Sequence, residues 1–359
     1  MATKPEETNT APAEGAGLEK QPEPNLMAES AEKKEDRDPV ESASAGVASL
    51  SVQDKRDEEK KAEEAPSAKV NAAEANTVTP TTGPVWPETA PDHPLTKFYD
   101  EFEALVSEAS HKEVYGIELT KSDPFHTKLI LQKFLRANQG DLEKAKKQLL
   151  DTLVWRREFD PIKAAGETFD KSKFAGLGYV LELEGVPESP NKKDIATFNI
   201  YGAVKDNKAT FGDLEGFLRW RVGLMEKSVR ALSLSTATTP IPNFGEGPDP
   251  YQGFQIHDYL QVSFLRRDPL VKAATNKTIE LLGRHYPETL SRKFFVNVPV
   301  VMGWVFQAVK MVVAKETTKK FTVLSYGNQL AGELGPGVPR TYGGEKAELD
   351  DVAEGMTLV

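Results

Sequence analysis

A short segment of the chain places an imidazole and a phenol where both could act on one ligand. The segment FQIHDYLQVSF (254–264) alternates between apolar and other side chains, which predicts a strand. His257 and Tyr259 then project from the same side of that strand. Because this side carries no Lys, Arg or Glu, it does not resemble an ordinary solvated face. A pocket is one environment that the pair could face.

A tyrosine in such a pocket is a candidate ligand for a metal centre. A phenol has an ordinary pKa near ~10, so a tyrosinate needs a cation, a hydrogen bond or a metal to stabilise it at neutral pH. Ferric haem is one centre that takes tyrosinate as an axial ligand. Neutral His257 would then hydrogen-bond beside Tyr259. The alternative is that both are core side chains that meet polar partners.

Arg221 stands where the helical period demands an apolar residue. A helix is predicted from Phe211 to about Leu232, opened by the capping-box pattern of Thr210 and Asp213. Its apolar stripe consists of Leu214, Phe217, Leu218, Leu224 and Met225. Arg221 falls within this stripe, and a buried guanidinium needs an anion or strong acceptors. The alternative is an arginine at the edge of the stripe that reaches water or forms a structural ion pair.

Two further candidates lie on predicted strands. Tyr201 belongs to ATFNIYGAV (196–204), on the more polar side of that strand. Lys293 starts the segment KFFVNVP (293–299), and a lysine at the mouth of a pocket would suit a carboxylate or a phosphate. Each has an ordinary alternative, which is a half-buried tyrosine for Tyr201 and a solvated lysine for Lys293.

The elements that must position these residues alternate between strands and helices after Pro161. Strands are predicted at 178–184, 196–204, 254–264, 293–299 and 321–325. Helices are predicted at 211–232, at 269–285 and from 300 to about 315, and a loop rich in Pro and Gly covers 233–253. This alternation predicts an α/β fold in which helices cover a mainly parallel sheet.

Composition divides the chain into three parts. Residues 1–90 hold too little apolar surface to offset chain entropy, so we expect a disordered acidic tail there. Residues 91–160 show a helical period and predict a small helical subdomain, with Asp141 as the N-cap of its last helix. Residues 161–359 form the α/β domain.

The composition also excludes several classes of function. A net charge of -10 argues against general nucleic-acid binding. The chain has no cysteine, so it offers no thiol nucleophile, disulfide or thiolate metal site. We find no P-loop, G-x-S-x-G or HExxH motif, and we expect a protein that is not an enzyme. The absence of an apolar leader and the polar interruptions at Gln307 and Lys310 predict a cytoplasmic protein, peripheral at most to a membrane.

Several segments together resemble the CRAL-TRIO lipid-binding family. LQKFLRANQGDLEKAKKQLLDTLVWRREF (131–159) resembles the helical N-terminal part of that family. HYPETLSRKFFVNVPVVMGWVFQAVKMVV (285–313) resembles its tyrosine-proline-glutamate turn, asparagine-proline strand and gating helix, and VPRTYGG (338–344) its paired-glycine segment. The resemblance implies a sheet floor and helical walls around a deep apolar pocket.

The HDY sequence at 257–259 is similar to that of the fungal non-classical phosphatidylinositol transfer proteins that bind haem. In typical relatives this strand reads aspartate, two residues, glycine, one residue, serine, and here Gln261 replaces the glycine. The resemblance implies haem b as cofactor, with Tyr259 as the axial ligand to the iron. The other haem contacts that it implies are His257, Tyr201, Arg221 and Lys293.

The resemblance also implies a phosphatidylinositol headgroup site at Glu288, Thr317 and Lys320. Thr289 stands where typical transfer proteins have an arginine, which weakens this headgroup site, and Thr317 and Lys320 also suit an ordinary turn. We therefore expect phosphatidylinositol transfer and haem binding, with peripheral contact at the endoplasmic reticulum and roles in phosphoinositide homeostasis and in oxidant or haem stress. The alternatives are a lipid carrier without haem and a haem sensor or buffer without lipid transfer.

Overall fold

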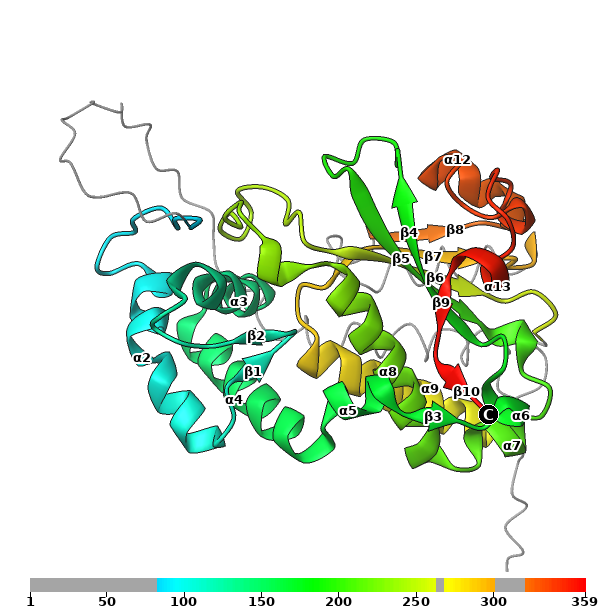
Figure 1. The fold of residues 1–359 in the computed structure, drawn as a ribbon, viewed down its shortest axis with the longest axis horizontal. Coiled ribbons are helices and arrows are strands. Elements are labelled where there is room, and N and C mark those ends of the chain that lie inside the picture. Colours follow the sequence, from blue (N-terminus) through cyan, green and yellow to red (C-terminus); the bar gives the residue numbers. More distant parts are fainter. Residues whose placement is uncertain (1–82, 263–267, 301–319) are drawn as a thin grey trace, which may run out of the picture. The chain divides into compact units, whose positions relative to one another are not determined.

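The computed structural model describes residues 83–262, 268–300 and 320–359 (Figure 1). The disorder predicted for residues 1–90 therefore lies mostly outside the described residues, as do Thr317 and almost all of the predicted gating helix. Trp86, near the end of the predicted tail, is buried and its ring centroid lies 5.4 Å from that of Phe125. The packed structure thus includes Trp86.

Three helices build the N-terminal part, as the period of the sequence predicts. They are α2 (Pro94–Ala109), α3 (Pro124–Ala137) and α4 (Leu142–Phe159), followed by the short α5 (Pro161–Gly166). Asp141 caps α4 by accepting a hydrogen bond from the Lys144 amide, which confirms the predicted cap. A hairpin of β1 (Glu113–Val114) and β2 (Ile117–Glu118) lies between α2 and α3 and was not predicted. Tyr115 and Gly116 both have positive φ in its turn, as a tight hairpin requires.

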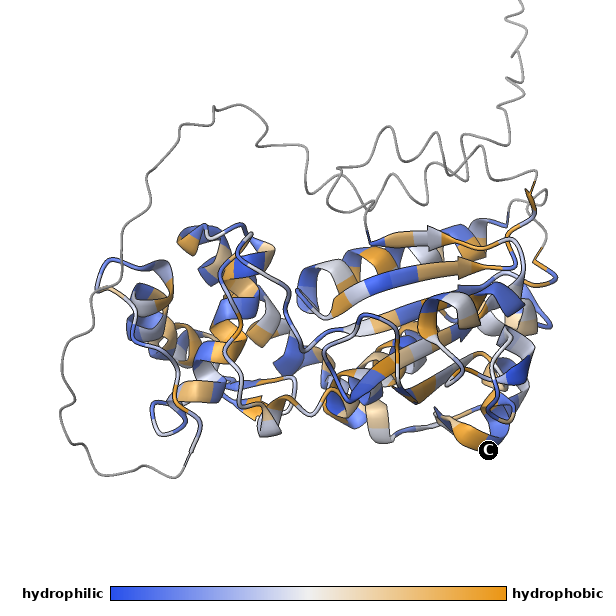
Figure 2. Ribbon diagram, turned by 90° about the horizontal axis from the view of Figure 1, so that it is seen from above, coloured by the Kyte–Doolittle hydropathy of each residue, from blue (hydrophilic) through white to orange (hydrophobic). Residues whose placement is uncertain are grey.

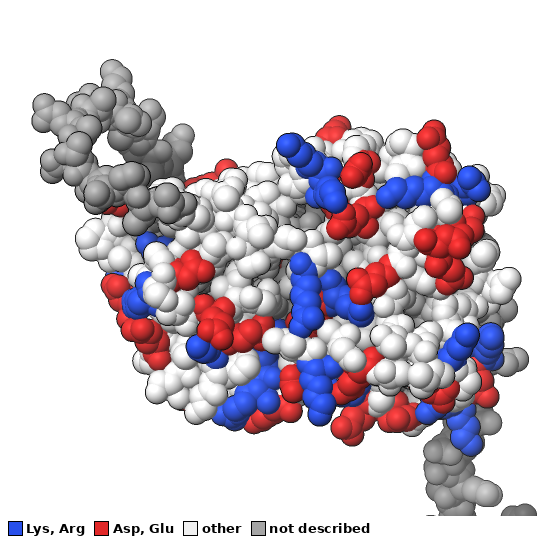
Figure 3. Space-filling model, in the orientation of Figure 1, with Lys and Arg blue, Asp and Glu red and all other residues white. Residues whose placement is uncertain are grey.

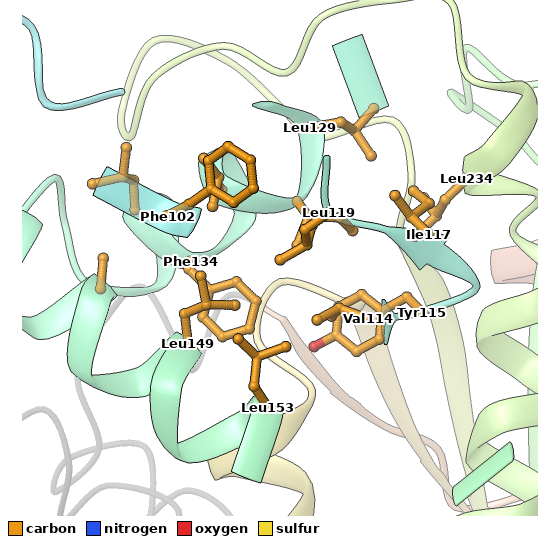
Figure 4. Close-up of a cluster of buried hydrophobic side chains, with 14 of the residues drawn as sticks. Phe102, Val114, Tyr115, Ile117, Leu119, Leu129, Phe134, Leu149, Leu153 and Leu234 are labelled. Atoms are coloured by element: carbon orange, nitrogen blue, oxygen red, sulfur yellow. The ribbon is translucent and has the colours of Figure 1, made fainter. Parts of the chain in front are cut away.

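The helices and the hairpin share one hydrophobic core. Figure 4 shows Phe102, Phe134, Leu149 and Leu153 from the helices around Leu119, which follows β2. In Figure 2 these helices carry both hydrophobic and hydrophilic residues, as amphipathic helices do. The core continues into the next part of the chain through Val222, Met225, Val229, Leu281 and Tyr286.

A six-stranded sheet forms the centre of the C-terminal part (Figure 1). Its strands, in spatial order, are β8 (Phe321–Val323), β7 (Leu290–Val296), β6 (Gly253–Asp258), β5 (Lys193–Ile200), β4 (Gly178–Glu184) and β9 (Glu354–Gly355). Strands β5 to β8 pair in parallel, while β4 is antiparallel to both β5 and β9. The predicted α/β fold with a mainly parallel sheet is confirmed.

Different elements cover the two faces of this sheet. One face packs against α12 (Leu330–Leu334), the 3₁₀ helix η5 (Arg340–Tyr342) and α13 (Leu349–Val352), and it presents Phe198, Ile256 and Phe294 to them. The other face lies under α8 (Leu214–Ala231), where the Thr197 hydroxyl bonds that of Ser228 at 2.6 Å. Helix α9 (Pro269–His285) packs against α8 and α4.

Short elements complete the described chain. They are β3 (Thr168–Phe169), α6 (Lys171–Phe174), η1 (Tyr201–Ala203), α7 (Asn207–Phe211), η2 (Leu234–Thr236), η4 (Gly327–Gln329) and β10 (Thr357–Leu358). Strand β10 pairs in parallel with β3, so the end of the chain is fastened to the start of the α/β part.

Several predicted elements differ from the structure in their bounds. Strand β5 ends at Ile200, so Tyr201 lies beyond it in η1, β7 ends at Val296 and β8 ends at Val323. The strand predicted over 254–264 ends at Asp258, because the amide of Val262 turns back to the Tyr259 carbonyl at 3.0 Å and Gln261 has a φ of 67°. The helix predicted over 211–232 corresponds to α8, which begins at Leu214, and Phe211 is the last residue of the separate helix α7. The capping box of Thr210 and Asp213 was wrong, since Asp213 is itself the N-cap of α8 and accepts from the Gly216 amide at 2.9 Å.

The charges on the surface and the hydropathy of the helices bear on two predictions, the absence of a basic surface and the absence of a membrane span. On the face drawn in Figure 3, Lys and Arg lie among Asp and Glu rather than in a patch of one sign. Among residues 83–262, 268–300 and 320–359, no helix combines the length and the apolar composition that a membrane span requires.

Candidate functional site

The register of the sheet brings the candidate residues together. Across β5, β6 and β7, the face under α8 carries one row of Thr197, Gln255 and Lys293 and a second row of Asn199, His257 and Phe295. Lys293 is the fourth of the seven residues of β7, so it lies in the middle of that strand and not at a strand entrance as predicted. Neighbouring strands are held about 4.8 Å apart by their hydrogen bonds, which places these side chains within reach of one another.

An aromatic cluster lies at the C-terminal ends of β5 and β6. The Tyr201 hydroxyl and His257 Nδ1 are hydrogen-bonded at 2.7 Å. The Tyr201 ring centroid lies 5.2 Å from that of Tyr259, and the ring centroids of His257 and Phe295 are 5.7 Å apart. Tyr201 follows β5 in η1, whereas Tyr259 extends the sheet by one residue because its amide bonds the Val296 carbonyl at 3.0 Å. The predicted proximity of His257, Tyr259 and Tyr201 is therefore present.

Arg221 reaches this face from α8 and is buried, with 5% of its surface exposed. Its Nη2 donates to Gln255 Oε1 at 3.4 Å, and its Nη1 has no hydrogen-bond partner among the described residues. Burial lowers the pKa of the guanidinium, an effect that Tyr201 and Tyr286 oppose. Arg221 is therefore neither an edge arginine nor a member of an ion pair within the described chain.

The side chain of Gln255 hydrogen-bonds the side-chain amide of Asn199 as well as Arg221. Its Oε1 accepts from both Arg221 and Asn199 Nδ2, the latter at 3.1 Å. Asn199 Nδ2 also donates to the Ile256 carbonyl, which leaves Asn199 Oδ1 buried without a partner among the described residues. Two buried polar atoms of this face, the donor Arg221 Nη1 and the acceptor Asn199 Oδ1, are thus unsatisfied within the described chain, and each costs about 1–3 kcal/mol in that state.

Lys293 is the second cation of this face. Its Nζ lies 5.5 Å from the centroid of the Phe295 ring, and no carboxylate of the described chain lies within ion-pair distance of it. Burial lowers the pKa of its ammonium to about 8, and the charge of Arg221 acts in the same direction. Two cations that share a buried face without an acidic partner favour the binding of an anion.

Burial favours the neutral forms of His257, Tyr201 and Tyr259. Burial, reinforced by Lys293 and Arg221, holds the pKa of His257 well below its ordinary value. Burial raises the pKa of Tyr201 to about 12 and that of Tyr259 well above its usual range. Tyr201, Tyr259 and Lys293 nevertheless keep part of their surface exposed, which leaves them open to a ligand.

The predicted headgroup residues have other partners. Glu288 Oε2 accepts from Arg136 Nε at 3.3 Å and from Gln252 Nε2 at 2.9 Å, and Lys320 Nζ donates to the Leu290 carbonyl. Glu288 also has a φ of 52°, and its carbonyl accepts from the buried Lys133. Thr317 lies outside the described residues. The headgroup site stays a prediction.

Sequence reasoning did not single out Gln255, Asn199 or Phe295. The signal that could have found them is the strand register, because parallel pairing places Asn199 and Phe295 on either side of His257. Register depends on partners that a single strand does not reveal. Among the described residues no group of three or more His, Asp or Glu could hold a metal ion. A porphyrin supplies its own equatorial nitrogens, so haem needs only axial protein ligands.

Comparison with known proteins agrees with this fold. Residues 94–151 match the model of the CRAL/TRIO N-terminal domain, and residues 251–344 match that of the CRAL/TRIO domain. A phosphatidylinositol transfer protein SFH5 of Phaeosphaeria nodorum is 70% identical over 322 residues, which cover 89% of this chain and 97% of that protein.

More distant relatives agree as well. A phosphatidylinositol transfer protein SFH5 of Cryptococcus neoformans is 48% identical over 276 residues, covering 75% of this chain and 92% of that protein. The solved crystal structure of Sfh5 superposes with a TM-score of 0.61 at 29% identity, covering 73% of this chain and 90% of that one. The chain belongs to the CRAL/TRIO family.

Proposed function

We propose that this protein is a non-enzymatic carrier that transfers phosphatidylinositol and also binds haem b in the same pocket. The first part is supported by the 70% identity to a protein named as a phosphatidylinositol transfer protein. The second part rests on one observation, the buried Arg221 and the partly exposed Lys293 beside the Tyr201, His257 and Tyr259 cluster, two cations without a carboxylate partner in the described chain.

The residues of this face fit haem b. Haem carries two propionate carboxylates, and Arg221 Nη1 is a buried donor without a partner in the described chain. Phe295 offers an apolar ring beside His257, as a porphyrin face requires. Tyr259 offers a phenol that keeps part of its surface exposed. Bound haem would supply an iron centre that takes a phenolate ligand and changes oxidation state.

Each residue has a role that follows from its surroundings. Tyr259 would bind the iron, and since burial raises its pKa, the phenol keeps its proton until a cation replaces it. Arg221 would stabilise the tyrosinate or a propionate, and Lys293 the porphyrin periphery. His257, whose pKa is lowered by burial and then by the two cations, would support Tyr259 by a hydrogen bond or as a secondary ligand, while its contact with Tyr201 fixes its ring.

The two ligands would exclude each other. A porphyrin ligated by Tyr259 would occupy volume on the sheet face that acyl chains need, so we expect a protein loaded with haem to carry less phosphatidylinositol. Peripheral contact with the endoplasmic reticulum, and roles in phosphoinositide homeostasis and in oxidant or haem stress, belong to this proposal. The alternatives remain a lipid carrier without haem and a haem buffer without lipid transfer.

Two assays separate these alternatives. Transfer of radiolabelled phosphatidylinositol between vesicles above a heat-inactivated control supports the carrier role, and no transfer above that control removes it. Protein purified from a haem-competent host should show a Soret band. A colourless protein that transfers lipid would leave the carrier alone, whereas a coloured protein without transfer would leave the haem buffer.

A further inference from the structure

Asp258, the last residue of β6, is a buried carboxylate that only neutral groups satisfy within the described chain. It is 3% exposed, and no described Lys, Arg or His lies within ion-pair distance of it. Its Oδ1 accepts from the Leu260 amide and from Asn297 Nδ2, both at 2.8 Å, and its Oδ2 accepts from the Tyr342 hydroxyl at 2.7 Å. Each of these hydrogen bonds is costly to break, because a buried carboxylate that loses a donor pays the free energy of an unsatisfied acceptor.

The partners of Asp258 come from separate parts of the chain. Asn297 follows β7 with a φ of 58°, and its Oδ1 accepts from the Gly327 amide at 2.6 Å. A Cβ at Gly327 would lie 3.1 Å from the Asn297 amide atoms, so the close approach favours glycine there. Tyr342 packs its ring 5.1 Å from that of Phe198 on the same side of the sheet. We call Asp258, Asn297, Gly327 and Tyr342 the Asp258 network.

This network lies on the opposite side of the sheet from the ligand cluster. His257 and Tyr259 face α8, so Asp258 between them faces the C-terminal elements. The carboxylate holds the Leu260 amide, and the Tyr259 amide bonds Val296, so the backbone is held on both sides of the Tyr259 side chain.

The turn after Tyr259 is also in contact with the backbone of Gly202. A Cβ at Gly202 would lie 1.7 Å from the Leu260 carbonyl oxygen, so the two backbones are in direct contact. Gln261 is then held at a φ of 67°, a conformation that a non-glycine residue adopts only at a cost. The backbone conformation at residues 259–261 is therefore set by its surroundings and not by local preference.

We propose that the Asp258 network is a positioning device that sets the direction of the Tyr259 phenol from the opposite side of the sheet. Tyr259 is the first residue beyond β6, so without these contacts its side chain would change direction whenever the backbone of residues 259–261 moved. Fixed in this way, the oxygen is presented to a ligand without reorganisation on binding. This inference deepens the proposed haem role of Tyr259, although the orientation itself does not depend on haem.

Tyr342→Phe tests the inference because it removes one donor to Asp258 and keeps the ring that packs on Phe198. Tyr179→Phe is the matched control, since the Tyr179 hydroxyl also donates to a carboxylate, that of Asp350, and its ring packs in the same core. A conservative third variant is Asp258→Asn, which can keep all three contacts if Tyr342 becomes the acceptor.

The first readout is independent of haem. With 3-fluorotyrosine incorporated at position 259, we expect the ¹⁹F resonance of the ligand-free protein to shift and broaden in Tyr342→Phe. It should stay in place in Tyr179→Phe and nearly so in Asp258→Asn. An unchanged resonance in Tyr342→Phe, or an equal shift in the Tyr179→Phe control, would overturn the inference.

The second readout uses the haem-loaded protein. Haem dissociation from Tyr342→Phe should be faster by about three- to tenfold, the effect of one hydrogen bond, with a shifted phenolate-to-iron charge-transfer band. Both should be unchanged in Tyr179→Phe. If the wild-type protein takes up no haem, the haem proposal fails while the ¹⁹F measurement still decides the positioning role. If the wild-type protein binds haem and Tyr342→Phe dissociates at the wild-type rate, the positioning role fails alone.

Discussion

Two single residues, Arg221 and Lys293, give the sheet face under α8 its positive charge. Each is a cation on the face between α8 and the sheet, and neither has an acidic partner in the described chain. Arg156 shows the usual arrangement for comparison. It is 1% exposed, and its guanidinium bonds Glu226 at 2.7 Å and Glu113 at 2.8 Å. The contrast points to an anionic ligand as the missing partner of Arg221 and Lys293.

Replacing these two buried arginines should have opposite effects on the ligand-free protein. Arg221→Met removes an unpaired buried charge, so we expect the free energy of unfolding in urea to stay the same or to rise. Arg156→Met leaves the carboxylates of Glu113 and Glu226 without their cation, so it should lower the free energy of unfolding by about 3–5 kcal/mol. An Arg221→Met variant that loses as much stability as Arg156→Met would show that Arg221 already has a partner within the protein.

Lys293 should make stability depend on pH in the alkaline range. Its pKa is about 8 in the folded protein and near ~10.4 in an unfolded chain. Between these values the unfolded state binds more protons, so this residue makes unfolding less favourable as pH rises from 8 to 10. The difference in unfolding free energy between the wild type and Lys293→Met should therefore grow in favour of the wild type over that range. A difference that is constant with pH would refute the lowered pKa.

At the scale of elements, the end of β6 governs where the ligand residues lie. Gln261 has a backbone φ of 67°, which glycine adopts without strain. A residue with a side chain at this φ therefore costs stability at the turn that carries Tyr259.

Gln261→Gly should stabilise the protein by up to about 1 kcal/mol in thermal or urea unfolding, because the strain at positive φ is relieved. Lys205→Gly is the control at an exposed position without positive φ, and there the added freedom of the unfolded chain should lower stability. Equal losses in both variants would argue that the turn at Gln261 is unstrained.

The sequence predicted most elements and their type, for physical reasons that also explain its errors. Helix α9 and strand β4 have the predicted bounds, because a Pro at the first helical position and a run of β-branched and apolar residues are local signals. The end of β6 was missed because Asp258 is bonded to residues 297 and 342, which are distant in sequence. The helical period showed Arg221 within the apolar stripe and left a buried and an edge position both open, because its burial and its contact with Gln255 depend on tertiary packing.

In the molecule as a whole, the N-terminal helices pack directly against the part that contains the sheet. The Trp155 and His285 rings are stacked with centroids 4.4 Å apart, and Arg156 of α4 bonds Glu226 of α8. Helix α8 thus carries Arg221 to the ligand face and Glu226 to the N-terminal helices. A ligand that binds Arg221 acts on a helix that both parts share.

In the proposed function, Tyr259 of the intact protein binds haem iron as tyrosinate. The most direct measurement is the absorption spectrum and haem content of the purified full chain, compared among wild type, Tyr259→Phe and His257→Ala with matched folding. Tyr259→Phe keeps the ring volume, so it should abolish the wild-type spectrum through loss of the ligand alone, whereas His257→Ala should only weaken haem retention. Wild-type haem content and spectrum in Tyr259→Phe, together with loss of both in His257→Ala, would contradict the account and assign the iron to His257.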